Sequence, residues 1–132
     1  ALIEGILDGT IDMIATDHAP HSEKEKSGGL RSSLNGIVGL ETAFPVLYTR
    51  LVRRGILSLN KLVELMSTAP ARRFGIDIGN STAEFEISTP YIVDSAEFLS
   101  LGKASPFVGM QVFGKCIKTT RNGKTVKEDK VN

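Results

Sequence analysis

Both histidines of the chain stand beside a carboxylate in one short segment, Asp17-His18-Ala19-Pro20-His21. The segment directly follows an apolar run, residues 11–16, and active sites of α/β sheets and β/α barrels lie at such strand ends. A carboxylate in this place can ligate a metal and can take a proton from metal-bound water. The spacing alone is also compatible with a helix-capping aspartate followed by two surface histidines, so both interpretations stay open.

The elements around this segment point to missing neighbours. Residues 11–16 lack polar alternation, which is typical of a strand covered on both faces. Residues 17–35 are polar and predict a long loop that is functional or mobile, with a plausible hinge at Gly28-Gly29. Its charged run, residues 22–26, is expected to be a solvated loop or helical turn. Because a parallel strand needs partners joined by crossovers, the strand at residues 11–16 has none to pair with inside this chain.

The clearest helix follows the loop. Apolar residues recur at three and four positions and predict a helix over residues 37–54, with Pro45 removing one hydrogen bond and bending it. Asn35 either caps this helix or offers, together with Gly36, backbone donors to an anionic group.

Two further helices and a small β portion complete the expected order of elements. Ser58 is a good N-cap for the second helix, Pro70 fits the first turn of a third, and Gly75 ends it. Asn122-Gly123 predicts a hairpin. The expected strands are residues 84–87, 91–93, 112–120 and 124–127. The fold class is therefore α/β, with residues 1–76 and 77–132 as its two portions.

Composition excludes several functional classes. The 132 residues are 41% hydrophobic and 23% charged, the balance of a soluble globular protein. A net charge of +1 gives no electrostatic argument for nucleic acid or a membrane surface, and no stretch approaches the roughly 18 apolar residues of a membrane span. The single cysteine, Cys116, excludes an internal disulfide and a thiolate zinc site and fits a reducing, cytoplasmic compartment. The chain begins without Met inside an expected helix, which favours a fragment or a processed product.

The Asp17–His21 segment resembles the last metal-site motif of the dihydroorotases, a group within the amidohydrolase superfamily. The resemblance continues through residues 35–45, 66–75 and 102–107 and the terminal hairpin. It implies the C-terminal part of a metal-dependent (β/α)8 TIM barrel, with strand eight ending at Asp17. Residues 1–76 would then belong to the barrel, and residues 77–132 would form part of a composite β-sandwich with its tail.

The resemblance also implies roles for individual residues. Asp17 would ligate the metal and act as general base and then acid, and His21 would contact the substrate carboxylate. Backbone groups of Asn35 and Gly36 would hold the substrate, while His18 receives no chemical role beyond supporting the turn. The implied reaction interconverts dihydroorotate and N-carbamoyl-L-aspartate in pyrimidine biosynthesis, with zinc as the cofactor.

The other metal ligands of the family lie upstream of its aspartate motif and have no counterpart here. The isolated chain is therefore expected to be inactive without the missing N-terminal barrel portion. One rival is another cyclic amidohydrolase, such as a hydantoinase or allantoinase, although a basic His21 suits a carboxylate-bearing ring. A second rival is a non-catalytic interaction module that forms a homo-oligomer or binds aspartate transcarbamoylase.

Overall fold

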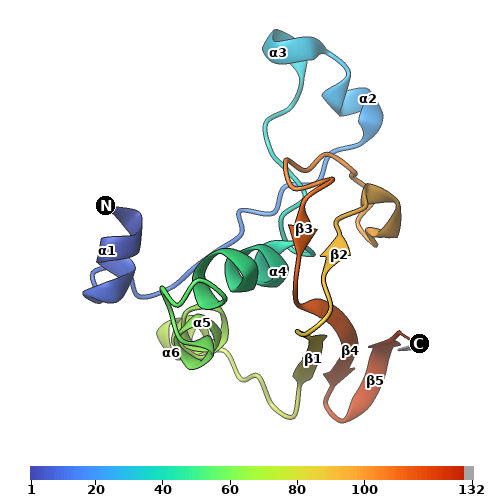
Figure 1. The fold of residues 1–132 in the computed structure, drawn as a ribbon. Helices are drawn as coiled ribbons and strands as arrows, with labels where there is room; N and C mark the ends of the chain where they lie inside the picture. The colour runs from blue at the N-terminus through green and yellow to red at the C-terminus, as the bar shows by residue number, and fades with distance from the viewer. Residues whose placement is uncertain (130–132) are drawn as a thin grey trace.

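The computed structural model describes residues 1–129 (Figure 1). The chain begins with helix α1 (Leu2–Leu7) and continues as an extended segment to two single-turn helices, α2 (Glu23–Lys26) and α3 (Gly29–Ser32). Figure 1 shows α2 and α3 projecting from the body of the molecule. Among the described residues, no helix is long and apolar enough to cross a membrane.

Residues 11–16 do not form the predicted strand. The N–H of Ile14 donates to the carbonyl of Leu65 (2.9 Å), and the N–H of Ile11 donates to that of Gly5 (2.7 Å), so the segment is held by isolated bonds. A strand ladder needs a neighbouring strand, and the described part of the chain places none beside this segment. Among the residues that the structure describes, the one trace of parallel pairing is an isolated bridge between His18 and Ile37.

The helix predicted over residues 37–54 begins later than expected. Helix α4 (Ala43–Leu47) starts after Thr42 and continues as a π-helical turn, Tyr48–Val52. Residues 37 and 38 are engaged elsewhere, because the Ile37 carbonyl accepts from Ala19 N–H and Val38 N–H donates to Ala104 O. Pro45 consequently lies in the first turn, where a missing N–H removes no helical bond, so the predicted loss of a hydrogen bond is wrong and the bend stays a prediction.

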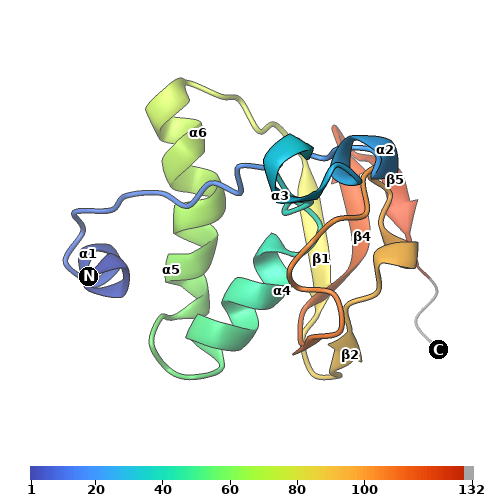
Figure 2. The ribbon, with the colours of Figure 1, turned by 90° about the horizontal axis from the view of Figure 1, so that it is seen from above.

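The second and third predicted helices are one continuous helical stretch. Helix α5 (Leu59–Val63) passes through a π-helical turn, Glu64–Thr68, into α6 (Ala69–Phe74), as Figure 2 shows. The predicted cap is confirmed, since Ser58 Oγ accepts from Lys61 N–H at 3.1 Å, and so is the end at Gly75, which adopts φ 64°. The π-type register before Pro70 accommodates a residue that has no N–H to donate.

As far as residue 129, the β portion consists of two small antiparallel sheets. One sheet has the order β1-β4-β5, and the other pairs β2 with β3. Asn122 (φ 50°) and Gly123 (φ 76°) form the predicted tight turn between β4 and β5. The strand predicted over residues 112–120 is divided at Phe113-Gly114. The strands are β1 (Thr82–Glu86), β2 (Tyr91–Ile92), β3 (Gln111–Val112), β4 (Lys115–Arg121) and β5 (Lys124–Glu128).

Two clusters of buried apolar side chains make up the core of residues 1–129. One joins α1 to the long helices through Ile6, Leu51, Leu57 and Leu65. The other joins the segment after Gly36 to the β portion through Val38, Val93, Phe98 and Val112. The predicted boundary between residues 76 and 77 falls in the connection from α6 to β1, and it stays a prediction. Residues 130–132 of the second portion lie outside the described residues.

Candidate functional site

The segment from Asp17 to His21 forms a turn that presents the Asp17 carboxylate outward. Asp17 adopts φ 48°, a left-handed conformation uncommon outside glycine, and backbone strain of this kind often accompanies functional sites. The next residue, His18, is fixed by a hydrogen bond that its N–H donates to Thr16 Oγ1 at 3.3 Å. The Asp17 side chain is exposed, and no hydrogen bond from residues 1–129 engages its carboxylate.

His18 ties this turn to the segment that precedes α4. Its Nδ1 accepts the backbone N–H groups of Gly39 (3.3 Å) and Leu40 (3.2 Å). Both contacts require that Nδ1 carry no proton, so the ring proton resides on Nε2. Together with the Ala19–Ile37 backbone bond (3.0 Å), these contacts make His18 the support of the turn.

Three of the predicted site residues meet at this turn. His21 Nε2 lies 2.8 Å from the Asn35 carbonyl oxygen, and the nitrogen donates because a carbonyl only accepts. Gly36 adopts φ 128°, and an added Cβ would lie 2.5 Å from Ala19 Cβ and 2.7 Å from Ala19 O. Only glycine permits this crossing. Asn35 does not cap a helix, because α4 begins at Ala43.

The segment of residues 98–107 supports the turn from its other side. The sequence indicated only residues 102–107 of this segment, as a further block of resemblance. An added Cβ on Gly102 would lie 2.8 Å from His21 O and 2.9 Å from His21 N, so the two backbones touch. The Glu41 carboxylate accepts the N–H groups of Leu99 (2.6 Å) and Ser100 (3.1 Å). No spacing pattern in the sequence predicts either contact, because each joins residues far apart in the chain.

The surroundings of Glu41 favour its charged form. Partial burial acts to raise the pKa of this carboxyl, but the hydrogen bonds from Ser100 and Leu99 outweigh it, with a smaller contribution from Lys103. The pKa of Glu41 therefore lies below its ordinary value, and the carboxylate is a permanent acceptor at neutral pH.

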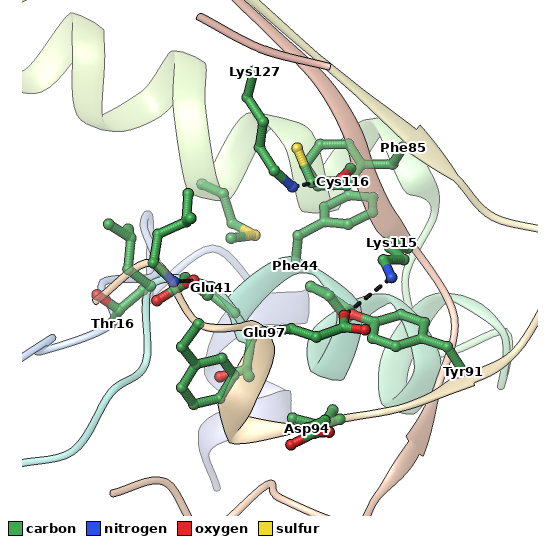
Figure 3. A pocket seen from close by; sticks show the side chains of 18 of the residues that line it. Thr16, Glu41, Phe44, Phe85, Tyr91, Asp94, Glu97, Lys115, Cys116 and Lys127 are labelled. Atoms are coloured by element: carbon green, nitrogen blue, oxygen red, sulfur yellow. Dashed lines mark hydrogen bonds and ion pairs between the residues drawn. The ribbon is translucent and has the colours of Figure 1, made fainter. Parts of the chain in front are cut away.

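A cavity of about 380 Å³ lies between α4, the three-stranded sheet and the segment after β2 (Figure 3). Phe44, Phe85 and Tyr91 line it, and burial, with smaller effects of Glu97 and Cys116, raises the pKa of Tyr91 to about 12. The cavity is distinct from the turn. Thr16 and Glu41 reach its wall, whereas the four predicted site residues, all within the described part of the chain, lie outside its lining.

The described residues do not hold a metal by themselves. Within residues 1–129, no group of three or more His, Cys, Asp or Glu side chains is placed to bind an ion. A catalytic zinc takes about three protein ligands, and Asp17 supplies at most one position with its carboxylate. The donor set present in this chain is therefore incomplete.

Comparison with solved structures places the fold among the cyclic amidohydrolases. The L-hydantoinase (dihydropyrimidinase) from Arthrobacter aurescens is 35% identical with a TM-score of 0.83, over 96% of this chain and 31% of that one. The dihydropyrimidinase from Brevibacillus agri is 26% identical with a TM-score of 0.87, over 96% of this chain and 30% of that one. The fold is thus that of a partial amidohydrolase domain.

Curated relatives narrow this class. The dihydroorotase of Lactiplantibacillus plantarum is 45% identical over 135 residues, and that of a Geobacillus species is 47% identical over 133 residues. These matches cover 94% and 96% of this chain but 31% of each relative. No family model matches the chain. The chain is therefore similar to part of these dihydroorotases and spans about 31% of the length of the curated relatives it matches.

Proposed function

We propose that the complete protein to which this chain contributes is a dihydroorotase, which interconverts dihydroorotate and N-carbamoyl-L-aspartate in pyrimidine biosynthesis. The observation that carries the proposal is the turn at residues 17–21, packed against Asn35 and Gly36 in a chain 45–47% identical to curated dihydroorotases. The turn presents one carboxylate and, a few residues away, a histidine beside exposed backbone. This arrangement suits a small ring that carries its own carboxylate.

Asp17 is the proton-transferring residue of this proposal. Its exposed carboxylate accepts a proton from the water that adds to the ring carbonyl and returns it to the ring nitrogen as the C–N bond breaks. Asp17 is also proposed as one ligand of a zinc ion. Because the donor set in residues 1–129 is incomplete, the remaining ligands must come from outside these residues.

His21 and the backbone of Asn35 and Gly36 are proposed to receive the substrate carboxylate. His21 already donates from Nε2 to the Asn35 carbonyl, so Nδ1 is the nitrogen left for the substrate. Donation from both nitrogens requires the imidazolium form, which is complementary to a carboxylate. A hydantoin ring has no such group, and this difference favours dihydroorotate over the substrates of the hydantoinases.

The remaining architecture is proposed by the same reasoning. Residues 11–16 become barrel strand eight when neighbouring strands from the rest of the protein lie beside them, and residues 77–132 form a small β unit. Exposed apolar side chains at Leu2, Leu7 and Phe74, each more than 60% accessible, support a covering partner. The proposed partner is the missing portion of the barrel. A homo-oligomer or a complex with aspartate transcarbamoylase would be an additional assembly of the complete protein.

An activity assay on the complete protein tests the proposal directly. We expect turnover of dihydroorotate and of N-carbamoyl-L-aspartate, and little turnover of hydantoin or dihydrouracil. A preference for hydantoin would replace the proposal with the hydantoinase alternative. The isolated chain should bind zinc weakly and turn over nothing; tight stoichiometric binding with turnover would contradict the assignment of the other ligands to the rest of the protein.

A further inference from the structure

One lysine of the charged run in residues 22–26 behaves unlike its neighbours. The helical turn expected there is confirmed as α2, and Lys24 is exposed as a solvated run requires. Lys26 is half-buried instead. Its Nζ donates to the carbonyl oxygens of Leu34 (2.8 Å) and Gly36 (2.9 Å), at the far end of the loop. Two of the three N–H donors of this ammonium are therefore used for hydrogen bonds to the loop backbone and not for bonds to water.

These contacts complete a pattern at the segment next to His21. Lys26 holds the carbonyls of Leu34 and Gly36, and His21 Nε2 holds the carbonyl between them, that of Asn35. Three consecutive peptide groups are therefore oriented by only two side chains. In a trans peptide the N–H points opposite to the C=O, so fixing these carbonyls also fixes the directions of the three N–H groups that follow them.

The base of the loop keeps Lys26 in place. Ser22 and Glu25 form a capping box at the start of α2, with Ser22 N–H donating to Glu25 Oε2 at 2.8 Å. The two ends of the loop are joined where Leu34 N–H donates to Glu25 O (3.0 Å) and Ser33 Oγ donates to Lys26 O (2.7 Å). From this base the Lys26 side chain extends to the carbonyl of Gly36, the residue that packs against Ala19 of the Asp17–His21 turn.

We infer that Lys26 is a positioning residue for substrate binding, acting through the backbone of residues 34–36 and through His21. The inference rests on the proposed function, because it assigns to Lys26 the orientation of the groups that receive the substrate carboxylate. Lys26 itself does not touch the reacting atoms. Its loss should weaken binding of substrate and transition state alike, which raises KM and leaves kcat nearly unchanged.

Three variants of the complete protein test the inference by steady-state kinetics. In Lys26→Met we expect KM for dihydroorotate to rise about tenfold, the effect of roughly 1.4 kcal/mol of binding, with kcat within about twofold. Lys26→Arg keeps a cation with several donors and should restore most of the affinity. Lys24→Met, the matched control two residues earlier, should leave both constants unchanged.

Hydrogen exchange on the same variants separates this inference from the proposed function. The amides of Leu34 and Val38 are hydrogen-bonded, and Lys26→Met should accelerate their exchange whether or not dihydroorotate is the substrate, while Lys24→Met should not. Unchanged exchange in Lys26→Met would show that Lys26 does not hold the backbone of residues 34–36. Unchanged KM, a fall in kcat alone, or equal effects of the Lys24 and Lys26 variants would overturn the positioning role. Failure of the wild type to act on dihydroorotate would count against the proposed function alone.

Discussion

At the scale of single residues, the site depends on backbone conformations that few residue types accept. Asp17 occupies the left-handed region at φ 48°, which aspartate tolerates better than most residues. His18 contributes its Nδ1 as an acceptor and thereby fixes where Asp17 stands. The neighbouring histidines therefore divide their tasks, since His18 supports the turn and His21 reaches Asn35.

Asp17→Asn should abolish proton transfer while preserving the turn. Asparagine tolerates the left-handed conformation, so the backbone is retained, but an amide cannot act as a general base. We expect kcat of the complete protein to fall by about a thousandfold, within the range for removal of a general acid–base. Glu23→Gln, which changes an exposed carboxylate of α2, is the control. A variant of Asp17 with near-normal turnover would contradict the role.

Gly36→Ala should destabilise the protein more than Gly9→Ala. Both glycines have positive φ, but an added Cβ meets nothing within 4 Å at Gly9, whereas at Gly36 it meets Ala19 at 2.5 Å. Strain alone should cost about 1–2 kcal/mol at Gly9. The clash at Gly36 should add roughly 1–3 kcal/mol. Thermal unfolding of both variants checks the order, and equal Tm values would contradict the close crossing.

At the scale of elements, tertiary bonds decide where helices begin and which segments stay extended. Residues 37–40 carry a helical apolar pattern, but their backbone groups form hydrogen bonds to Ala19, Ala104 and the ring of His18 instead of within a helix. Thr42, almost fully buried, precedes the true start of α4. Glu41 lies between these elements and binds the segment of residues 98–107 through Leu99 and Ser100.

Glu41→Gln should remove a stabilisation that depends on pH. The folded pKa of Glu41 lies below its ordinary value of 4.5, so its contribution is complete above pH 4.5 and is lost as pH falls through the folded pKa. At pH 7 the variant should lose about 1 kcal/mol, because the carboxylate is partly exposed. The difference from wild type should shrink below pH 4.5 in urea unfolding. Glu23→Gln, an exposed control, should show no such trend.

At the scale of the whole molecule, the β portion is attached to the helices by aromatic contact. Phe85 of β1 stacks on Phe44 of α4 with ring centroids 3.9 Å apart, and Phe44 also stacks on Tyr48 at 5.6 Å. Gly114 adds to this attachment, since an added Cβ would lie 2.9 Å from the Phe44 ring. The sheet therefore depends on α4 for part of its hydrophobic cover.

Phe85→Ala should loosen this attachment. Phe85 is half-buried, so we expect a loss of about 2–3 kcal/mol, below the roughly 3–5 kcal/mol of a fully buried phenylalanine. Leu101→Ala, whose side chain is 96% exposed, should change stability by less than about 0.5 kcal/mol. Urea unfolding of the complete protein measures both. Equal losses would show that the stack contributes little.

Local patterns were sufficient for several features. The cap at Ser58, the helix end at Gly75 and the hairpin at Asn122-Gly123 depend on neighbours within a few residues, and each is confirmed. The Asp17 motif and its resemblance likewise pointed to the dihydroorotases, which the similarity to curated relatives bears out. The assignment of Asp17, His21, Asn35 and Gly36 to their chemical roles stays a prediction.

Contacts between distant residues were beyond these patterns. The bonds of Lys26 to Leu34 and Gly36 and the approach of Gly102 to His21 depend on the closure of loops, which no local spacing encodes. The strand expected at residues 11–16 failed for the related reason that a strand is completed by its neighbours. Periodicity and capping act over one or two turns of chain, whereas pairing and burial are properties of the assembled molecule.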